Sequence, residues 1–217
     1  MLIKANIKDI GNRNILHPLI RNSSYNHKNT VILDYRLRCR NFKNKVPINF
    51  LKDVIMVSEK SFIQNNSFLS NQVRSHVFNT IDNNSSILGV GGESYMYLRN
   101  VNNYNNKHFI TNNEVIYNDA ITNNVLKNFQ LDLVNYDNLL IRELFDNAVV
   151  NLSKLNVNII RQLNRIINKK IIIISCHHND FWKKSKILSK FRLINRKKFI
   201  DEKIGYFITV NIFVKKS

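Results

Sequence analysis

The sequence predicts an α/β fold in which a mainly parallel sheet carries helices on both faces and ends in an antiparallel hairpin. Three observations indicate this fold. From residue 61 onward, short apolar segments of strand length alternate with amphipathic segments of helix length. The most apolar segment, KIIIIS at 170–175, has the composition of a strand that is buried on both faces. Near the C-terminus, two strand-like segments are separated by only a short connection, which favours antiparallel pairing.

The first part of this region is a series of alternating helices and strands. Leu69, Val73 and Val77 recur at helical spacing, so a helix with one buried stripe is expected there. In chain order we expect a helix at Ser67–Thr80, a strand at 86–90 that ends in Gly91 and Gly92, a helix near Glu93–Val101, a strand at 114–117 (EVIY), a helix at Ile121–Phe129, and strands at 138–141 and 147–152.

The second part contains the central strand and the hairpin. An amphipathic helix over Leu155–Ile167 leads into KIIIIS, and a further helix is expected near Asp180–Phe191. Strands at 192–200 and 206–214 complete the hairpin, and the second of them alternates apolar and polar residues with period two. An antiparallel strand in an otherwise parallel sheet is typical of the class I S-adenosylmethionine-dependent methyltransferase fold, so we expect a domain of this class, Rossmann-like, over residues 58–217.

Residues 1–57 read as a basic N-terminal extension that precedes this domain. The segment lacks sustained apolar periodicity and is densest in charge at 34–45. Arg36, Arg38 and Arg40 alternate, which on a strand places three guanidinium groups on one face. Such a row favours contact with phosphate groups over a plain solvated edge.

The net charge predicts a polyanionic partner. The chain has 33 Lys+Arg against 15 Asp+Glu, for a formal charge of +18. This excess favours RNA or DNA, because neutralising phosphates releases counterions. An acidic membrane is disfavoured, since no apolar run approaches the roughly 18 residues of a spanning helix. The residues expected to contact RNA are Arg36, Arg38, Arg40, Lys43, Lys45, Lys183, Lys184, Arg196, Lys197 and Lys198.

The cysteines indicate the compartment. Cys39 and Cys176 lie far apart, and neither has a companion at disulfide or metal-ligand spacing. We therefore expect a reducing intracellular environment, in the cytoplasm or mitochondrion, and no bound metal.

Several segments resemble, in the correct order, the catalytic domain of the RNA uracil-5 methyltransferase family. They are SFIQNN at 61–66, ILGVGGESYMYL at 87–98 and ISCHH at 174–178. The resemblance implies that Gln64 and a loop with Gly89, Gly91 and Gly92 contact S-adenosylmethionine, and that Cys176 attacks C6 of a uridine. Such a site needs an acidic residue after the second strand to hold the ribose, and Asp119, just after EVIY, is the candidate.

The residues that handle protons in this family have no counterparts here. Where the family has Asp-Pro-Pro-Arg after its fourth strand, this chain has Asn151 to Lys154. The family's general base is a glutamate in the terminal hairpin, and the corresponding segment, 206–210, has no carboxylate. The opening residues also resemble N6-adenosine dimethylating rRNA methyltransferases, whose Asn-Leu-Pro-Tyr segment is likewise incomplete at 151–154.

These observations lead to one prediction and two alternatives. The prediction is a non-catalytic RNA-binding protein on a degenerate methyltransferase-like fold, with no cofactor, that belongs to a ribosome or another ribonucleoprotein and contacts ribosomal RNA and neighbouring subunits. The first alternative is an active uridine-C5 methyltransferase that uses S-adenosylmethionine and Cys176. The second is a small basic nucleic-acid-binding protein unrelated to methyltransferases, which a structure without a parallel sheet would favour.

Overall fold

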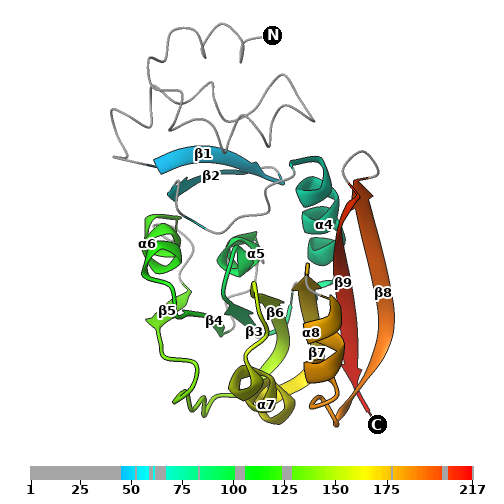
Figure 1. The fold of residues 1–217 in the computed structure, drawn as a ribbon. Helices are drawn as coiled ribbons and strands as arrows, with labels where there is room; N and C mark the ends of the chain where they lie inside the picture. Colours follow the sequence, from blue (N-terminus) through cyan, green and yellow to red (C-terminus); the bar gives the residue numbers. More distant parts are fainter. Residues whose placement is uncertain are drawn as a thin grey trace, which may run out of the picture.

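The structure, a computed structural model, describes residues 45–51, 53–58, 61, 67–82, 84–100, 106–123, 129–176, 178–201 and 205–216. A twisted sheet runs through the molecule with helices on both faces, and a separate two-stranded hairpin lies across one end (Figure 1). No helix among these residues is long and apolar enough to cross a membrane.

The large sheet has seven strands in the order β5-β4-β3-β6-β7-β9-β8. Strands β3 to β7 pair in parallel, whereas β9 is antiparallel to both of its neighbours. The strands are β3 (Ile87–Val90), β4 (Lys107–Thr111), β5 (Gln130–Leu133), β6 (Phe145–Asn151), β7 (Ile167–Ser175), β8 (Phe191–Asp201) and β9 (Tyr206–Lys215). The mainly parallel sheet with its C-terminal antiparallel hairpin confirms the predicted class I methyltransferase-like fold, and the alternative without a parallel sheet is wrong.

Helices on the two faces of the sheet bury two separate apolar clusters. On one face lie α4 (Ser67–Thr80), α5 (Ser94–Asn100) and α6 (Glu114–Asn123), and on the other lie α7 (Val157–Ile166) and α8 (His178–Ser185). Strand β7 contributes to both clusters, because Ile172 and Ile174 point to the first face while Ile171 and Ile173 point to the second. This explains why KIIIIS reads as a continuous apolar run.

The hairpin β1 (Lys45–Phe50) and β2 (Asp53–Ser58) packs on the first face. Its strands pair antiparallel, with Lys45 opposite Ser58. Four of its apolar side chains, Ile48, Phe50, Ile55 and Val57, are buried in the same cluster as α4 and α5. The predicted division at residue 58 thus leaves a packed hairpin on its N-terminal side, and residues 1–44 lie outside the described residues. The division itself stays a prediction.

Two predicted strands and one predicted helix are wrong. Residues 114–117 form the first turn of α6, because the Asn113 side chain accepts hydrogen bonds from the backbone N–H groups of Val115 and Ile116 (2.9 and 3.2 Å) and so caps a helix there. The second strand of the fold is β4, which lies just before this cap. Residues 121–123 are the last turn of α6 rather than the start of a new helix, and residues 138–141 lie in the connection between β5 and β6.

Candidate functional site

The carboxyl ends of the parallel strands meet beneath the hairpin β1–β2, as Figure 1 shows. In open α/β sheets this edge is where ligands bind. The loop after β3, the end of β6 and the end of β7 all reach it, and they carry the glycines, Asn151 and Cys176. The candidate site is therefore this edge of the sheet.

Gly91 and Gly92 let the loop after β3 lie directly on the end of β6. Both have left-handed backbone angles, with φ of 64° and 47°. A Cβ at Gly92 would lie 2.6 Å from the Asn151 carbonyl oxygen, and one at Gly91 would overlap the Leu152 side chain. The side of each glycine on which a Cβ would lie is thus taken by the chain itself. Gly89 has another role, since a Cβ there would lie 2.7 Å from Leu98 of helix α5.

A buried ion pair fixes the same loop to the rest of the first face. Glu93 follows Gly92, and its carboxylate lies 2.7 Å from the guanidinium of Arg74 on α4. Both side chains are almost fully buried. Arg74 also donates to the Asn49 carbonyl of the hairpin (3.1 Å) and lies over the Phe50 ring. Burial on its own lowers the pKa of Arg74, but Glu93, with smaller contributions from Tyr97 and Tyr95, raises the pKa above its usual value.

Two further polar groups lie beside the glycine loop. The amide nitrogen of Asn151, Nδ2, is buried and has no hydrogen-bond partner among the described residues. The Tyr136 hydroxyl would lie 3.2 Å from a Cβ at Gly91, and burial raises the pKa of this tyrosine to about 12 against smaller opposing effects of Thr111 and Asn112. An unpaired buried amide is costly, so Asn151 marks the point on this edge where a polar ligand group or a water would bind.

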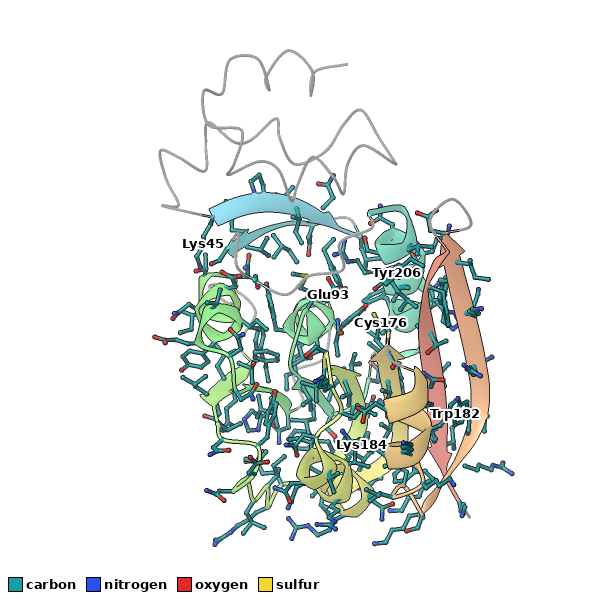
Figure 2. The ribbon with its side chains drawn as sticks, viewed as in Figure 1. Lys45, Glu93, Cys176, Trp182, Lys184 and Tyr206 are labelled. Atoms are coloured by element: carbon teal, nitrogen blue, oxygen red, sulfur yellow. The ribbon has the colours of Figure 1, made fainter. Side chains whose placement is uncertain are left out.

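Cys176 lies at the end of β7 beside a tyrosine of the terminal hairpin. The Tyr206 hydroxyl donates a hydrogen bond to the Cys176 sulfur at 3.1 Å, and Figure 2 shows the two residues together at this edge of the sheet. Burial, followed by the contact with Cys176, raises the pKa of Tyr206 above its usual value. The phenol therefore stays protonated at neutral pH and donates a proton to the hydrogen bond, so it is not a base. The side chains of His177 and His178 lie outside the description.

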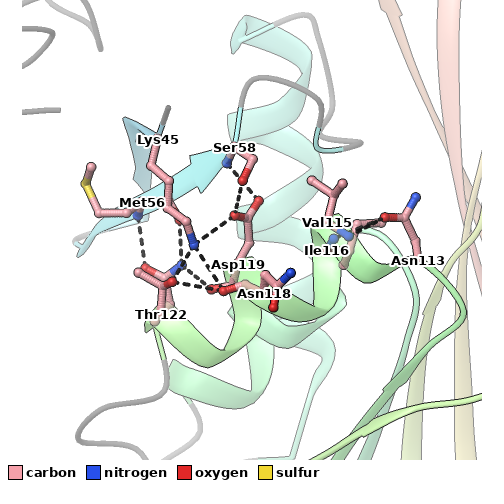
Figure 3. A network of polar contacts seen from close by, with 10 residues as sticks. Lys45, Met56, Ser58, Asn113, Val115, Ile116, Asn118, Asp119 and Thr122 are labelled. Atoms are coloured by element: carbon pink, nitrogen blue, oxygen red, sulfur yellow. Dashed lines mark hydrogen bonds and ion pairs between the residues drawn. The ribbon is translucent and has the colours of Figure 1, made fainter. Parts of the chain in front are cut away.

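Asp119 is part of a different structure from the one predicted. Its carboxylate accepts hydrogen bonds from the backbone N–H and the hydroxyl of Ser58 (2.8 and 2.6 Å) and pairs with Lys45 (3.2 Å), as Figure 3 shows. Nearby, the Asn123 side chain bonds both the N–H and the carbonyl of Met56 (2.9 and 2.7 Å). These contacts hold the hairpin on helix α6. Asp119 is not at the end of the second strand, because EVIY is helical.

With β4 as the second strand, the acidic residue that follows it is Glu114. This residue is exposed in the first turn of α6. A sequence prediction that placed the second strand at Lys107–Thr111 would have given Glu114 as the acidic residue after it. Gln64 lies outside the described residues. Gly91 and Gly92 lie at this edge of the sheet and Asp119 lies at the contact between α6 and the hairpin, and the S-adenosylmethionine site stays a prediction.

The cationic residues predicted to bind RNA fall into three groups. Lys45 is engaged with Asp119, and Lys184 pairs with Asp180 (2.8 Å) and donates to the Leu155 carbonyl. Lys183 is exposed on α8, and every residue of β8 from 192 to 198 is exposed, which includes Arg196, Lys197, Lys198 and a fourth cation that the prediction missed, Arg192. Arg36, Arg38, Arg40 and Lys43 lie outside the described residues. Among the residues that are described, no cluster of His, Cys, Asp and Glu could hold a metal.

Comparisons with solved structures show where this fold occurs elsewhere. The chain superimposes on a tRNA (uracil-54, C5)-methyltransferase from Pyrococcus abyssi with a TM-score of 0.65 and 19% identity, over 79% of this chain and 45% of that one. It superimposes on the tRNA m1G37 methyltransferase of M. jannaschii with a TM-score of 0.60 and 13% identity, over 82% and 58% of the two chains. It superimposes on the N-methyltransferase NodS from Bradyrhizobium japonicum with a TM-score of 0.56 and 12% identity, over 68% of this chain and 88% of that one.

At these identities the likeness establishes a class I methyltransferase-like fold. This chain spans less than two thirds of the length of either tRNA methyltransferase. No protein-family model matches the sequence, and no curated protein matches it significantly.

Proposed function

We propose that this protein binds RNA on a methyltransferase-like scaffold and does not transfer a methyl group to uridine. The main support for RNA binding is the exposed positive charge of strand β8. It is the edge strand of the sheet, and from residue 192 to 198 it is exposed, with four cations and no carboxylate. Like charges so close together repel each other, and a polyanion relieves that repulsion.

The net charge and the neighbours support RNA as the polyanion. A charge of +18 far exceeds the magnitude of about 2 to 8 that keeps a small domain soluble. Two of the neighbours are described as tRNA methyltransferases, so the same fold meets RNA in other proteins. Within this proposal the RNA is ribosomal, and the protein is a component of a ribosome or another ribonucleoprotein in the cytoplasm or mitochondrion.

Three features of the candidate site support the absence of methyl transfer. The glycine loop packs against Asn151 and Leu152, so its own chain fills the side of each glycine on which a Cβ would lie. The carboxylate in that loop, Glu93, is neutralised by Arg74. Next to Cys176, the hairpin supplies a phenol with a raised pKa where uridine methylation requires a base for the C5 proton.

Crosslinking in cells tests the proposed function. The tagged chain is irradiated, and the RNA that stays bound under denaturing conditions is sequenced. We expect ribosomal RNA, with reads concentrated in a few segments. Recovery of no RNA above an untagged control would contradict RNA binding. A predominance of transfer RNA would contradict the ribosomal assignment and leave RNA binding in place.

The Cys176–Tyr206 contact and the unpaired Asn151 amide favour a second candidate, an active uridine-C5 methyltransferase. In that case the thiolate adds to C6 of the base, and Asn151 contacts a bound ligand. The test is incubation with S-adenosylmethionine and RNA that contains 5-fluorouridine, which traps the covalent adduct because fluorine cannot leave as a proton. An adduct that is absent from the Cys176→Ala variant would establish the second candidate, whereas we expect none.

A further inference from the structure

A surface strip that contains two cations and two aromatic rings lies where α8 meets the terminal hairpin. We define it as Trp182 of α8, Arg196, Lys198 and Ile200 of β8, and Phe207 of β9. The pairing register places the β8 and β9 members on one face, since Arg196 lies opposite Asn211, Lys198 opposite Thr209 and Ile200 opposite Phe207. Phe213 of the same face contacts Phe181 of α8. The strip therefore lies on the α8 side of the sheet, opposite the side on which Cys176 packs.

Each cation of the strip lies over a ring. The Arg196 guanidinium is 4.8 Å from the centre of the Trp182 ring, and the Lys198 ammonium is 3.9 Å from the centre of the Phe207 ring. Trp182 is 38% exposed, and Figure 2 shows it on the side of α8 that faces the terminal strands. Arg196 and Lys198 are two residues apart, so their Cα atoms are about 7 Å apart along the strand.

Cations outnumber acidic residues on the strand that carries the strip. Asp180, the acidic residue of α8, is paired with Lys184. From 192 to 201 the strand has four cations and one acidic residue, Asp201. Arg192 and Lys197 face the other side of the sheet from the strip, because they lie opposite Val214 and Val210. Charged residues on an edge strand protect it from pairing with another chain. That role does not explain an exposed tryptophan with a guanidinium over its ring.

We propose that this strip binds single-stranded RNA, with bases stacked on Trp182 and Phe207 and phosphates held by Arg196 and Lys198. The proposal rests on the RNA binding proposed above and specifies the class of RNA and its place on the protein. Aromatic rings can stack only on bases that are not already stacked in a duplex, which selects unpaired RNA. Any base can stack on a ring, and the cations contact the phosphate backbone. The strip therefore distinguishes single-stranded from double-stranded RNA, and not one sequence from another.

The chain supplies its own reporter, because Trp182 is its single tryptophan. The full-length protein is titrated with a short oligouridine and with a duplex of the same length, while tryptophan fluorescence and the anisotropy of a dye on the RNA are followed together. We expect the single strand to quench the fluorescence saturably, with the same midpoint as the anisotropy. The duplex should bind with little quenching, because it contacts the cations without stacking.

Substitutions separate the contribution of the aromatic rings to RNA binding from that of the cations. Trp182→Ala should weaken binding of the single strand by about tenfold and binding of the duplex hardly at all. Trp182→Phe, which preserves packing, should recover most of the affinity and guards against a folding defect. Arg196→Gln and Lys198→Gln together should weaken binding of both RNAs. Arg161→Gln, an exposed cation on helix α7, is the matched control and should change neither.

Each outcome is decisive. RNA binding by anisotropy with unchanged tryptophan fluorescence would overturn the strip and leave the proposed function in place. Equal quenching by single strand and duplex would overturn the stacking. Binding of no RNA at all would overturn the strip and the proposed function together. If an extended peptide slows amide exchange in β8 while RNA causes no quenching, the edge strand binds a protein strand rather than RNA. That result would overturn the inference.

Discussion

The Arg74 guanidinium of helix α4 lies 2.7 Å from the Glu93 carboxylate that follows the glycine loop, and both groups are buried. Together with the bond from Arg74 to the Asn49 carbonyl, this pair joins α4, the loop and the hairpin. A buried charge without its partner is costly, whereas the intact pair roughly balances its own desolvation. The pair therefore links three segments of the first face through two side chains.

Replacing one member of this pair should destabilise the protein strongly. We expect Arg74→Met to lower the free energy of unfolding by about 3 to 5 kcal/mol, because Glu93 stays buried without a counter-ion. The double variant Arg74→Met, Glu93→Leu should recover a large part of that loss. Urea unfolding followed by circular dichroism measures both. An Arg74→Met protein with the wild-type urea midpoint would show that the pair is not buried as described.

The contact between Asp119 and Ser58 should control how firmly the hairpin is attached. Asp119→Asn removes the ion pair with Lys45 and one acceptor of the Ser58 bonds, at a cost of about 1 to 3 kcal/mol. Amide hydrogen exchange should accelerate in β1 and β2 more than in β7. Glu114→Gln, which changes an exposed carboxylate of the same helix, is the control and should leave exchange unchanged. Uniform acceleration throughout the protein would contradict a local role.

The stability of the fold should fall as the pH drops below the ordinary range of histidine. Burial and, to a lesser degree, Lys197 lower the pKa of His76, whose ring packs on Phe199. The unfolded chain then binds a proton at a higher pH than the folded chain, so stability is lost as pH falls through the unfolded pKa of about 6.5. His76→Gln should flatten the dependence of the urea midpoint on pH between 7 and 5.5.

An NMR titration of His76 checks the cause directly. Lys197→Gln should raise the pKa of this histidine, because a nearby cation is removed. Lys190→Gln, at an exposed position before β8, should not. A pKa of His76 at or above the usual value in the wild-type protein would contradict its burial.

Cys176→Ala should leave RNA binding unchanged. The sulfur is half-buried and packs beside the first cluster, so its removal should cost about 1 kcal/mol of unfolding free energy. Tyr206→Phe removes the hydrogen bond to the sulfur at a similar cost. Equilibrium binding and urea unfolding of both variants measure these effects. A tenfold loss of RNA affinity in Cys176→Ala alone would point to a role of the thiol in the RNA contact.

The sequence predicted most of the fold because its strands and helices differ in apolar period. Ser67–Thr80 was predicted with its observed bounds, and the order of the terminal strands followed from length and alternation. The strand β4 was missed because His108 interrupts its apolar pattern. The β-branched residues of EVIY favour a strand, whereas the Asn113 cap starts a helix there.

The site was less predictable than the fold. Asp119 and Lys45 are 74 positions apart in the sequence, and Arg74 lies on α4 whereas Glu93 lies in the loop before α5, so no local pattern reveals that they are paired. The pairing of Lys184 with Asp180 is an i, i+4 contact that helical spacing could have shown. The exposure of Arg192 follows from the place of β8 at the sheet edge, which required the strand order.

The N-terminal arginines remain part of the proposal and can be tested with the same RNA. Replacing Arg36, Arg38 and Arg40 by Ala should weaken binding across unrelated RNA sequences, with about 0.7 to 0.9 lost from the slope of log K against log salt for each phosphate contact removed. An unchanged slope in the triple variant would show that these residues do not contact phosphate.

The salt dependence of RNA binding is the most direct measurement of the central claim, that a cationic surface on this scaffold holds RNA. For single-stranded RNA at a series of salt concentrations, the four cations of β8 alone account for a slope of log K against log salt of about −3. We predict a wild-type slope at least that steep, which becomes shallower by about 3 when Arg192, Arg196, Lys197 and Lys198 are replaced by Gln and stays unchanged in Arg161→Gln. A wild-type slope near zero, or one that the fourfold replacement does not change, would contradict the account.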